Sequence, residues 1–87
     1  MIPFNFKQYQ DGAIAVTADG RLATLIGLSP FATDPCHEVV SGVLLGVANG
    51  KANIGLHGTD RDGNFWPGTA SKNDLCALLG IDYSVDD

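Results

Sequence analysis

This chain has little charge, few cysteines and no long apolar run, and each shortage narrows what the protein can be. Charged residues make up 17% of its 87 residues, against roughly 25% in an average globular protein. Affinity for nucleic acid comes mainly from basic contacts to phosphate, and five scattered basic residues with a net charge of −5 argue against general nucleic-acid binding. The longest near-apolar stretch, residues 39–48, is about half the length needed to span a bilayer, so we expect no membrane segment.

Length and composition predict one domain over residues 1–87, with an acidic tail at 82–87 that we expect to fray. A chain this short hides only about 60% of the surface that its unfolded form exposes. A partner subunit would therefore add stability, and we expect a homo-oligomer. Residues 1–5 lack the basic region and apolar core of a secretory signal, which favours a cytoplasmic protein in which Cys36 and Cys76 are free thiols.

What the chain does have is four turn signals that end in glycine. Tight hairpin turns need positive φ, which glycine adopts without penalty and which Asn or Asp tolerates better than most residues. The signals are Asp11-Gly12, Asp19-Gly20, Asn49-Gly50 and Asp62-Gly63. They predict one hairpin with strands at 13–17 and 22 to about 28, and a second hairpin with strands at 39–48 and 51–57.

The remaining segments predict a mainly β (α+β) fold: a small antiparallel sheet of two hairpins plus a short strand, with two short helical elements. Asn5 can cap an N-terminal helical turn that stops at Gly12. Residues 65–68 favour a short fifth strand ended by proline. Residues 71–74 (Ser-Lys-Asn-Asp) resemble a capping box, which predicts a C-terminal helix through Leu75, Leu78 and Leu79.

Alternation along the strands indicates which side chains face the core. In the strand at 22–28 we expect Leu22, Thr24, Ile26 and Leu28 to point inward. The strand at 39–48 is apolar on both faces, and one of its rows is small and rich in glycine. The N-terminal segment, the C-terminal helix or a second copy of the chain could cover that small row, and we favour the second copy.

No motif has the residue types and spacing of a catalytic centre, so we expect no enzymatic activity and no cofactor. Residues 60–63 (Asp-Arg-Asp-Gly) resemble part of a calcium loop, but both end carboxylates of that loop are missing, and a polar turn is the better interpretation. Cys36, His37, His57 and Cys76 lack the spacing of zinc ligands. Cys76 is better interpreted as a small buried apolar residue. A Cys–His nucleophilic pair would need the thiol and the imidazole to lie in contact in the folded protein, and the sequence gives no indication of such a contact.

One cluster carries the candidate site. Within ten residues the chain holds an aromatic ring, a guanidinium and several hydrogen-bonding groups: His57, Thr59, Arg61, Asn64 and Trp66. Such a set could clamp a planar or phosphorylated ligand, or anchor a protein interface, in which Trp and Arg are common hot spots. The alternative is that Trp66 and Phe65 plug the end of the core while Arg61 is solvated.

Several of these segments, in order, resemble a group of small phage and prophage proteins. The resemblance runs through residues 4–6 (Phe-Asn-Phe), residues 15–21 (Ala-Val-Thr-Ala-Asp-Gly-Arg), Asn49-Gly50 and residues 73–75 (Asn-Asp-Leu). The chain departs from the group at Ala18, where arginine is frequent, and in its longer loop at 29–38. The group has no assigned activity, so the resemblance implies a phage or prophage origin and an accessory role without a mechanism.

Two main hypotheses of function follow from these observations. The first is a non-enzymatic accessory protein that acts in the cytoplasm of the host cell, binds a host protein and inhibits or evades a host defence. The second is a protein that binds or sequesters a small nucleotide-like signal in a pocket between subunits, around Arg61 and Trp66. A third and weaker hypothesis is a minor structural component of the virion.

Overall fold

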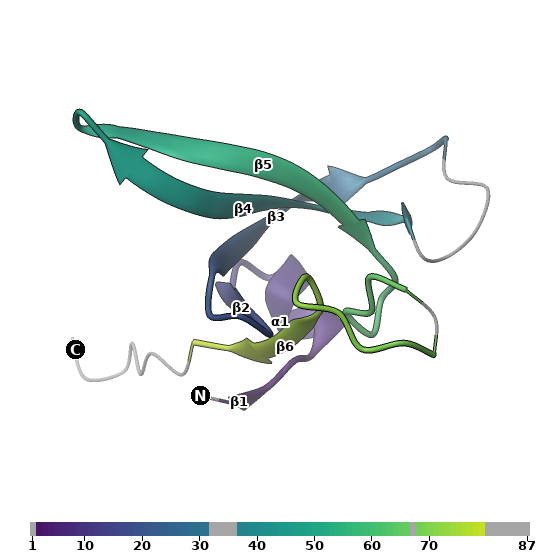
Figure 1. Cartoon of the computed structure of the whole chain (residues 1–87). Helices are drawn as coiled ribbons and strands as arrows, with labels where there is room; N and C mark the ends of the chain where they lie inside the picture. Colours follow the sequence, from purple (N-terminus) through teal and green to yellow (C-terminus); the bar gives the residue numbers. More distant parts are fainter. Residues whose placement is uncertain (1, 32–36, 67, 80–87) are drawn as a thin grey trace, which may run out of the picture.

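The computed structural model describes residues 2–31, 37–66 and 68–79, and these form a mainly β fold, as the sequence predicts. One antiparallel sheet of six strands has the order β1-β6-β2-β3-β4-β5 (Figure 1). No helix of the described part is long and apolar enough to cross a membrane. The elements are β1 (Ile2–Pro3), α1 (Phe6–Gln10), β2 (Ala15–Thr17), β3 (Leu22–Leu28), β4 (Val39–Ala48), β5 (Lys51–Thr59) and β6 (Leu75–Leu78).

Both predicted hairpins are confirmed, and the residues of their turns explain why. β2 pairs with β3, and β4 pairs with β5 through the register Ala48↔Lys51. In the second turn Asn49 and Gly50 have φ of 53° and 75°, the paired positive values that a two-residue hairpin turn demands. Gly20 closes the first turn with φ of 89°. Local backbone chemistry therefore sets four of the six strands.

The predicted N-terminal helical turn is also confirmed. The Asn5 side chain accepts a hydrogen bond from the backbone N–H of Gln8 at 3.0 Å, which caps the first turn of α1. The helix lasts five residues and buries Tyr9 completely. The Tyr9 hydroxyl donates to the Ser41 Oγ on β4 at 2.7 Å, so this hydrogen bond ties the helix to the sheet.

The predicted C-terminal helix is wrong: Leu75–Leu78 form β6, which lies between β1 and β2. The register passes from Val16↔Ala77 to Thr17↔Leu75, so Cys76 is the extra residue of a β-bulge. The bulge lets Leu75 and Leu78 face the same side at a spacing of three, which in the sequence imitates helical periodicity. The fold thus buries both leucines without a helix.

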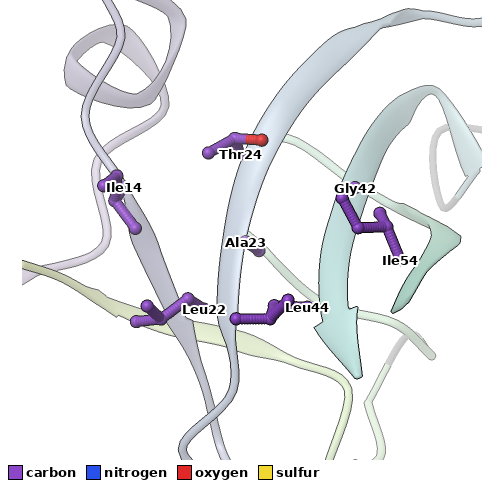
Figure 2. A pocket seen from close by; sticks show the side chains of 7 residues that line it. All are labelled: Ile14, Leu22, Ala23, Thr24, Gly42, Leu44 and Ile54. Carbon is purple, nitrogen blue, oxygen red and sulfur yellow. The ribbon is translucent and has the colours of Figure 1, made fainter. Parts of the chain in front are cut away.

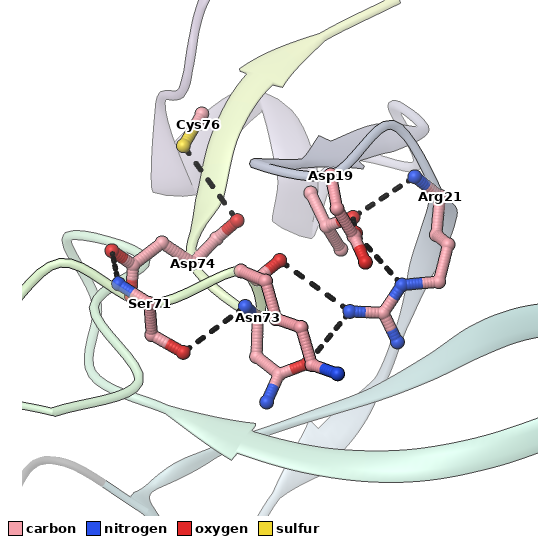
Figure 3. Close-up of polar contacts among 8 residues, drawn as sticks. Asp19, Arg21, Ser71, Asn73, Asp74 and Cys76 are labelled. Atoms are coloured by element: carbon pink, nitrogen blue, oxygen red, sulfur yellow. Dashed lines mark hydrogen bonds and ion pairs between the residues drawn. The ribbon is translucent and has the colours of Figure 1, made fainter.

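The segment resembling a capping box forms a polar turn in front of β6 (Figure 3). The Asp74 carboxylate accepts hydrogen bonds from the backbone N–H groups of Ser71 at 3.0 Å and Phe65 at 2.8 Å. Arg21 holds this turn to the first hairpin, because it donates to the Asn73 Oδ1 at 2.6 Å and to the Asp19 Oδ1 at 2.8 Å. The hydrogen bond from Arg21 lowers the pKa of the Asp19 carboxyl.

The short strand predicted at 65–68 is wrong as well. The described residues there form only an isolated bridge between Trp66 and Thr69, and Pro67 lies outside the described residues. The tail at 82–87, Cys36 and most of the loop at 29–38 also lie outside the described residues. The expectations for those segments therefore stay predictions.

The core lies on the face of the sheet that carries α1, which we call the inner face; the opposite face is the outer face. The row predicted to face the core from β3 is wrong, since Leu22, Thr24, Ile26 and Leu28 are all exposed. Ala23 is buried instead, and this small side chain leaves room for the Tyr9 ring. The core comprises Tyr9, Ala15, Ala23, Val39, Val43, Leu75 and Leu78.

Candidate functional site

The cluster predicted from the sequence lies at the end of β5 and in the loop that follows it. Its two rings, His57 and Trp66, form a continuous ladder of aromatic contacts together with Phe65 and His37. Ring centroids are 6.1 Å apart for His57 and Phe65, 5.1 Å for Phe65 and Trp66, and 6.2 Å for Trp66 and His37. Trp66 remains half exposed. The structure therefore brings His57 and Trp66 into one cluster through Phe65, a residue that the sequence named only in the alternative in which Trp66 and Phe65 plug the end of the core.

Arg61 points elsewhere, because Glu38 and Phe6 hold its guanidinium. The Nη2 atom donates to the Glu38 Oε1 at 2.9 Å and the Nε atom to Oε2 at 3.3 Å. The guanidinium carbon also lies 5.2 Å from the centre of the Phe6 ring, a distance that suits a cation–π contact. The hydrogen bond between Arg61 and Glu38 lowers the pKa of the Glu38 carboxyl and raises the pKa of Arg61. An anionic ligand would have to displace a carboxylate that is already in place.

The other two predicted residues stabilise the loop. Thr59 is buried, and its hydroxyl donates to the backbone carbonyl of Asp60 at 3.0 Å. The Asp60 carboxylate accepts hydrogen bonds from the backbone N–H groups of Asp62 at 2.9 Å and Asn64 at 2.8 Å. These bonds give Asp60 the role of a turn residue. The five predicted residues lie at the end of β5 and in the loop that follows it, but their polar groups do not converge on one pocket.

The described residues considered as metal ligands or nucleophiles are not arranged in a way that supports either role. Within residues 2–31, 37–66 and 68–79, no group of three or more His, Cys, Asp or Glu side chains could hold a metal ion. The expectation that Cys76 is buried is wrong, because its position in the bulge leaves it exposed. Partial desolvation, with a smaller contribution from Asp74, raises the pKa of the Cys76 thiol, which disfavours the reactive thiolate.

A second surface, only partly foreseen from the sequence, is the outer face of β3, β4 and β5. Strand pairing places Thr24, Gly42 and Leu56 in one row across the sheet and Leu44 with Ile54 in the next. Ile26 is the extra residue of a bulge in β3 and leans over Gly42. The large aliphatic side chains of this surface, which we call the outer cluster, are Leu22, Ile26, Leu44, Ile54 and Leu56.

The outer cluster is exposed to an unusual degree for aliphatic side chains. Leu22 is 37% exposed, Ile26 61%, Ile54 59% and Leu56 69%. A scattered exposed leucine needs no explanation, whereas neighbouring exposed aliphatic residues indicate an interaction site. The rows that hold the cluster contain no charged residue, and Thr24 contributes a hydroxyl group, so this part of the sheet offers mostly apolar contacts.

A groove runs through the outer cluster (Figure 2). Its volume is about 200 Å³, and it is lined by Ile14, Leu22, Ala23, Thr24, Gly42, Leu44 and Ile54. The glycine forms the floor, since a Cβ atom at Gly42 would lie 3.1 Å from the Ile26 Cδ1 and 3.4 Å from the Ile54 Cγ2. The apolar, glycine-rich row of β4 was the sequence signal for this surface, and what covers the row stays a prediction.

A bulge limits how far that row continues along β4. The register passes from Leu44↔Ile54 to Gly46↔Asn53, which leaves Leu45 as an extra residue. Leu45 leans toward Gly55 on the inner face, and Gly46 follows it there. The groove is therefore built from the first half of β4, and the half near the hairpin turn takes no part in it.

Comparisons of the chain with protein-family models, with curated proteins and with solved structures found no match.

Proposed function

We propose that this protein is a non-enzymatic binding protein that engages a partner protein through the outer cluster. One observation carries the proposal: adjacent strands expose aliphatic side chains around an apolar groove of about 200 Å³. That volume suits an aliphatic or aromatic side chain inserted from a partner surface, in the manner of an interface hot spot. The groove offers almost no hydrogen-bonding groups, so a polar small molecule would lose its hydration there without compensation.

The charge of the whole chain bears on the choice of partner. A net charge of −5 favours a partner protein with a basic surface. The resemblance to phage and prophage proteins extends the proposal to a host protein in the host cytoplasm. Inhibition or evasion of a host defence would then be the consequence of binding.

The nucleotide-binding alternative has weaker support. It relies on Arg61 as an anion clamp, yet the Arg61 guanidinium is bound by Glu38 and covers Phe6. A rise in melting temperature with one member of a nucleotide panel would favour this alternative. Detection of the protein in purified particles by mass spectrometry would favour the virion hypothesis instead.

Affinity capture from a bacterial host followed by titration with the purified partner tests the proposal. The variant Ile54→Lys places a charge beside the groove, and we expect it to weaken binding at least tenfold, which corresponds to about 1.4 kcal/mol. Leu45→Lys is the matched control, because Leu45 is similarly exposed at 49% on the same hairpin but leans toward the inner face. Equal affinities for the two variants would overturn the role of the outer cluster.

A further inference from the structure

The two edges of the sheet differ sharply in how well they resist pairing with another chain. One edge is β1, which has only two residues, one of them Pro3. The other edge is β5, which has nine residues, no proline and Lys51 as its only charged residue. Natural sheets usually protect an edge with proline, charge, a bulge or short length, and β5 uses none of these devices along residues 52–59.

The hydrogen-bonding edge of β5 is also regular. Each of the nine residues from Lys51 to Thr59 has a partner on β4, and the extra residue of the bulge, Leu45, belongs to β4. The hairpin of β4 and β5 extends beyond the rest of the sheet (Figure 1). A second strand could therefore approach β5 from the open edge of the sheet, where it would meet a regular row of backbone groups.

We propose that β5 pairs with β5 of a second copy of this chain, antiparallel and with the two-fold axis at Gly55. This is the register that pairs all nine residues. The interface is isologous, because each contact between two residues occurs twice with the two copies exchanged. Ile54 of one copy then lies opposite Leu56 of the other. Ala52 lies opposite Gly58, and Asn53 lies opposite His57.

Three features of the strand favour this register. Glycines meet at the axis, so no side chains collide at the centre of the pairing. The Ile54–Leu56 pairs on either side of the axis place aliphatic side chains across the new strand junction, as cross-strand stabilisation requires. The ends have complementary charge, because antiparallel pairing brings Lys51 of each copy to the end of β5 that leads into Asp60 of the other.

The same features favour a second copy over an unrelated peptide. An unrelated peptide could add to β5 by main-chain hydrogen bonds, but nothing would give that peptide the length of β5 or the opposite charge at each end. A second copy of β5 has both properties. Pairing of two copies would join the sheets into one of twelve strands and place two outer clusters side by side. The inference rests on β5, whose Ile54 and Leu56 also belong to the outer cluster, and it does not depend on what partner protein that cluster binds.

Charge substitutions at Asn53 and His57 test the register without altering the outer cluster, because both residues belong to the inner rows of β5. In the proposed dimer they lie opposite each other. The double variant Asn53→Lys/His57→Lys therefore sets lysine against lysine, and Asn53→Glu/His57→Glu sets glutamate against glutamate. Directly opposed like charges destabilise a strand pair. We expect each variant to raise the dimer dissociation constant at least tenfold, and an equimolar mixture of the two to recover heterodimers.

Sedimentation equilibrium and native mass spectrometry of the full chain measure the outcome. We expect the wild type at about twice the chain mass of 9.1 kDa, and the mixture as heterodimers in at least tenfold excess over homodimers. A wild type that stays monomeric at every soluble concentration overturns the inference. So do charge variants that fold, as far-UV circular dichroism reports, and still dimerise like the wild type. Neither result affects the proposed function, because the variants keep the outer cluster.

Discussion

Replacing Gly63 by alanine should destabilise the protein far more than the same change at another glycine with positive φ. Gly63 has φ of 86° and lies in the loop that packs against β6. A Cβ atom there would overlap the backbone oxygen of Leu75 and would lie 3.1 Å from the Leu75 Cβ and 3.2 Å from the Phe4 ring. The loop or the strand would have to move, which also strains the 2.8 Å hydrogen bond from the Leu75 N–H to the Gly63 carbonyl.

Gly20→Ala is the control, because Gly20 has φ of 89° and a Cβ atom there would meet nothing within 4 Å. The left-handed conformation alone costs alanine about 1–2 kcal/mol, which is the whole cost expected at Gly20. At Gly63 the overlap adds about 1–3 kcal/mol and the weakened hydrogen bond about 1 kcal/mol. We therefore expect a difference of about 2–4 kcal/mol between the two variants.

Urea unfolding followed by far-UV circular dichroism measures this difference. With a slope of about 1–2 kcal/mol per molar urea, the midpoint for Gly63→Ala should fall at least about 1 M below that for Gly20→Ala. Both variants should be compared at one protein concentration, since self-association would shift the midpoint. If Gly63→Ala fails to fold while Gly20→Ala folds, the expectation is also met. Equal midpoints would refute the close approach of the loop to β6.

Three further predictions concern buried and polar groups. Tyr9→Phe should lower the free energy of unfolding by about 1–2 kcal/mol in urea titrations, because the buried Ser41 hydroxyl loses its partner. Burial raises the pKa of Tyr9 above its ordinary value of 10.0, so the unfolded chain loses the hydroxyl proton at a lower pH than the folded chain. The free energy of unfolding should therefore fall as pH rises above 10.0, and it should fall less steeply in Tyr9→Phe. Asp74→Ala should cost about 1–3 kcal/mol, and Asp74→Asn less, because the amide still accepts one of the two backbone hydrogen bonds. In a Cys36→Ser background, alkylation of Cys76 should reach half its maximal rate at a higher pH than an ordinary thiol, and a lower midpoint would contradict the raised pKa.

The features of the fold that could be predicted from sequence are those fixed by neighbouring residues. Asn49-Gly50 and Asp19-Gly20 specify their hairpins because the turn conformation depends on these residues alone. The inward face of β3 could not be predicted, since both of its rows are apolar and the choice depends on where Tyr9 packs. β6 was missed because the bulge at Cys76 gives a strand the leucine spacing of a helix.

The candidate site shows the same division between local and distant contacts. Sequence placed His57 and Trp66 in one cluster correctly, since only one loop separates them. It could not show that Glu38, 23 positions before Arg61, would hold the guanidinium. The outer cluster was only half visible: the small row of β4 indicated a face without cover, but Ile26, Ile54 and Leu56 come from two other strands.

The place of β6 in the strand order has a consequence for how the chain folds during synthesis. β1 and β2 are near in sequence, yet each pairs with β6 and they do not pair with each other. The hairpins can form as soon as their residues leave the ribosome, whereas β1 must wait until the last strand emerges and inserts beside it. Such non-local pairing slows folding, because the entropy of closing a long loop is lost before any contact forms. Until then the nascent chain has an open seam in its sheet, which makes the interval before β6 emerges its most vulnerable stage to aggregation and proteolysis.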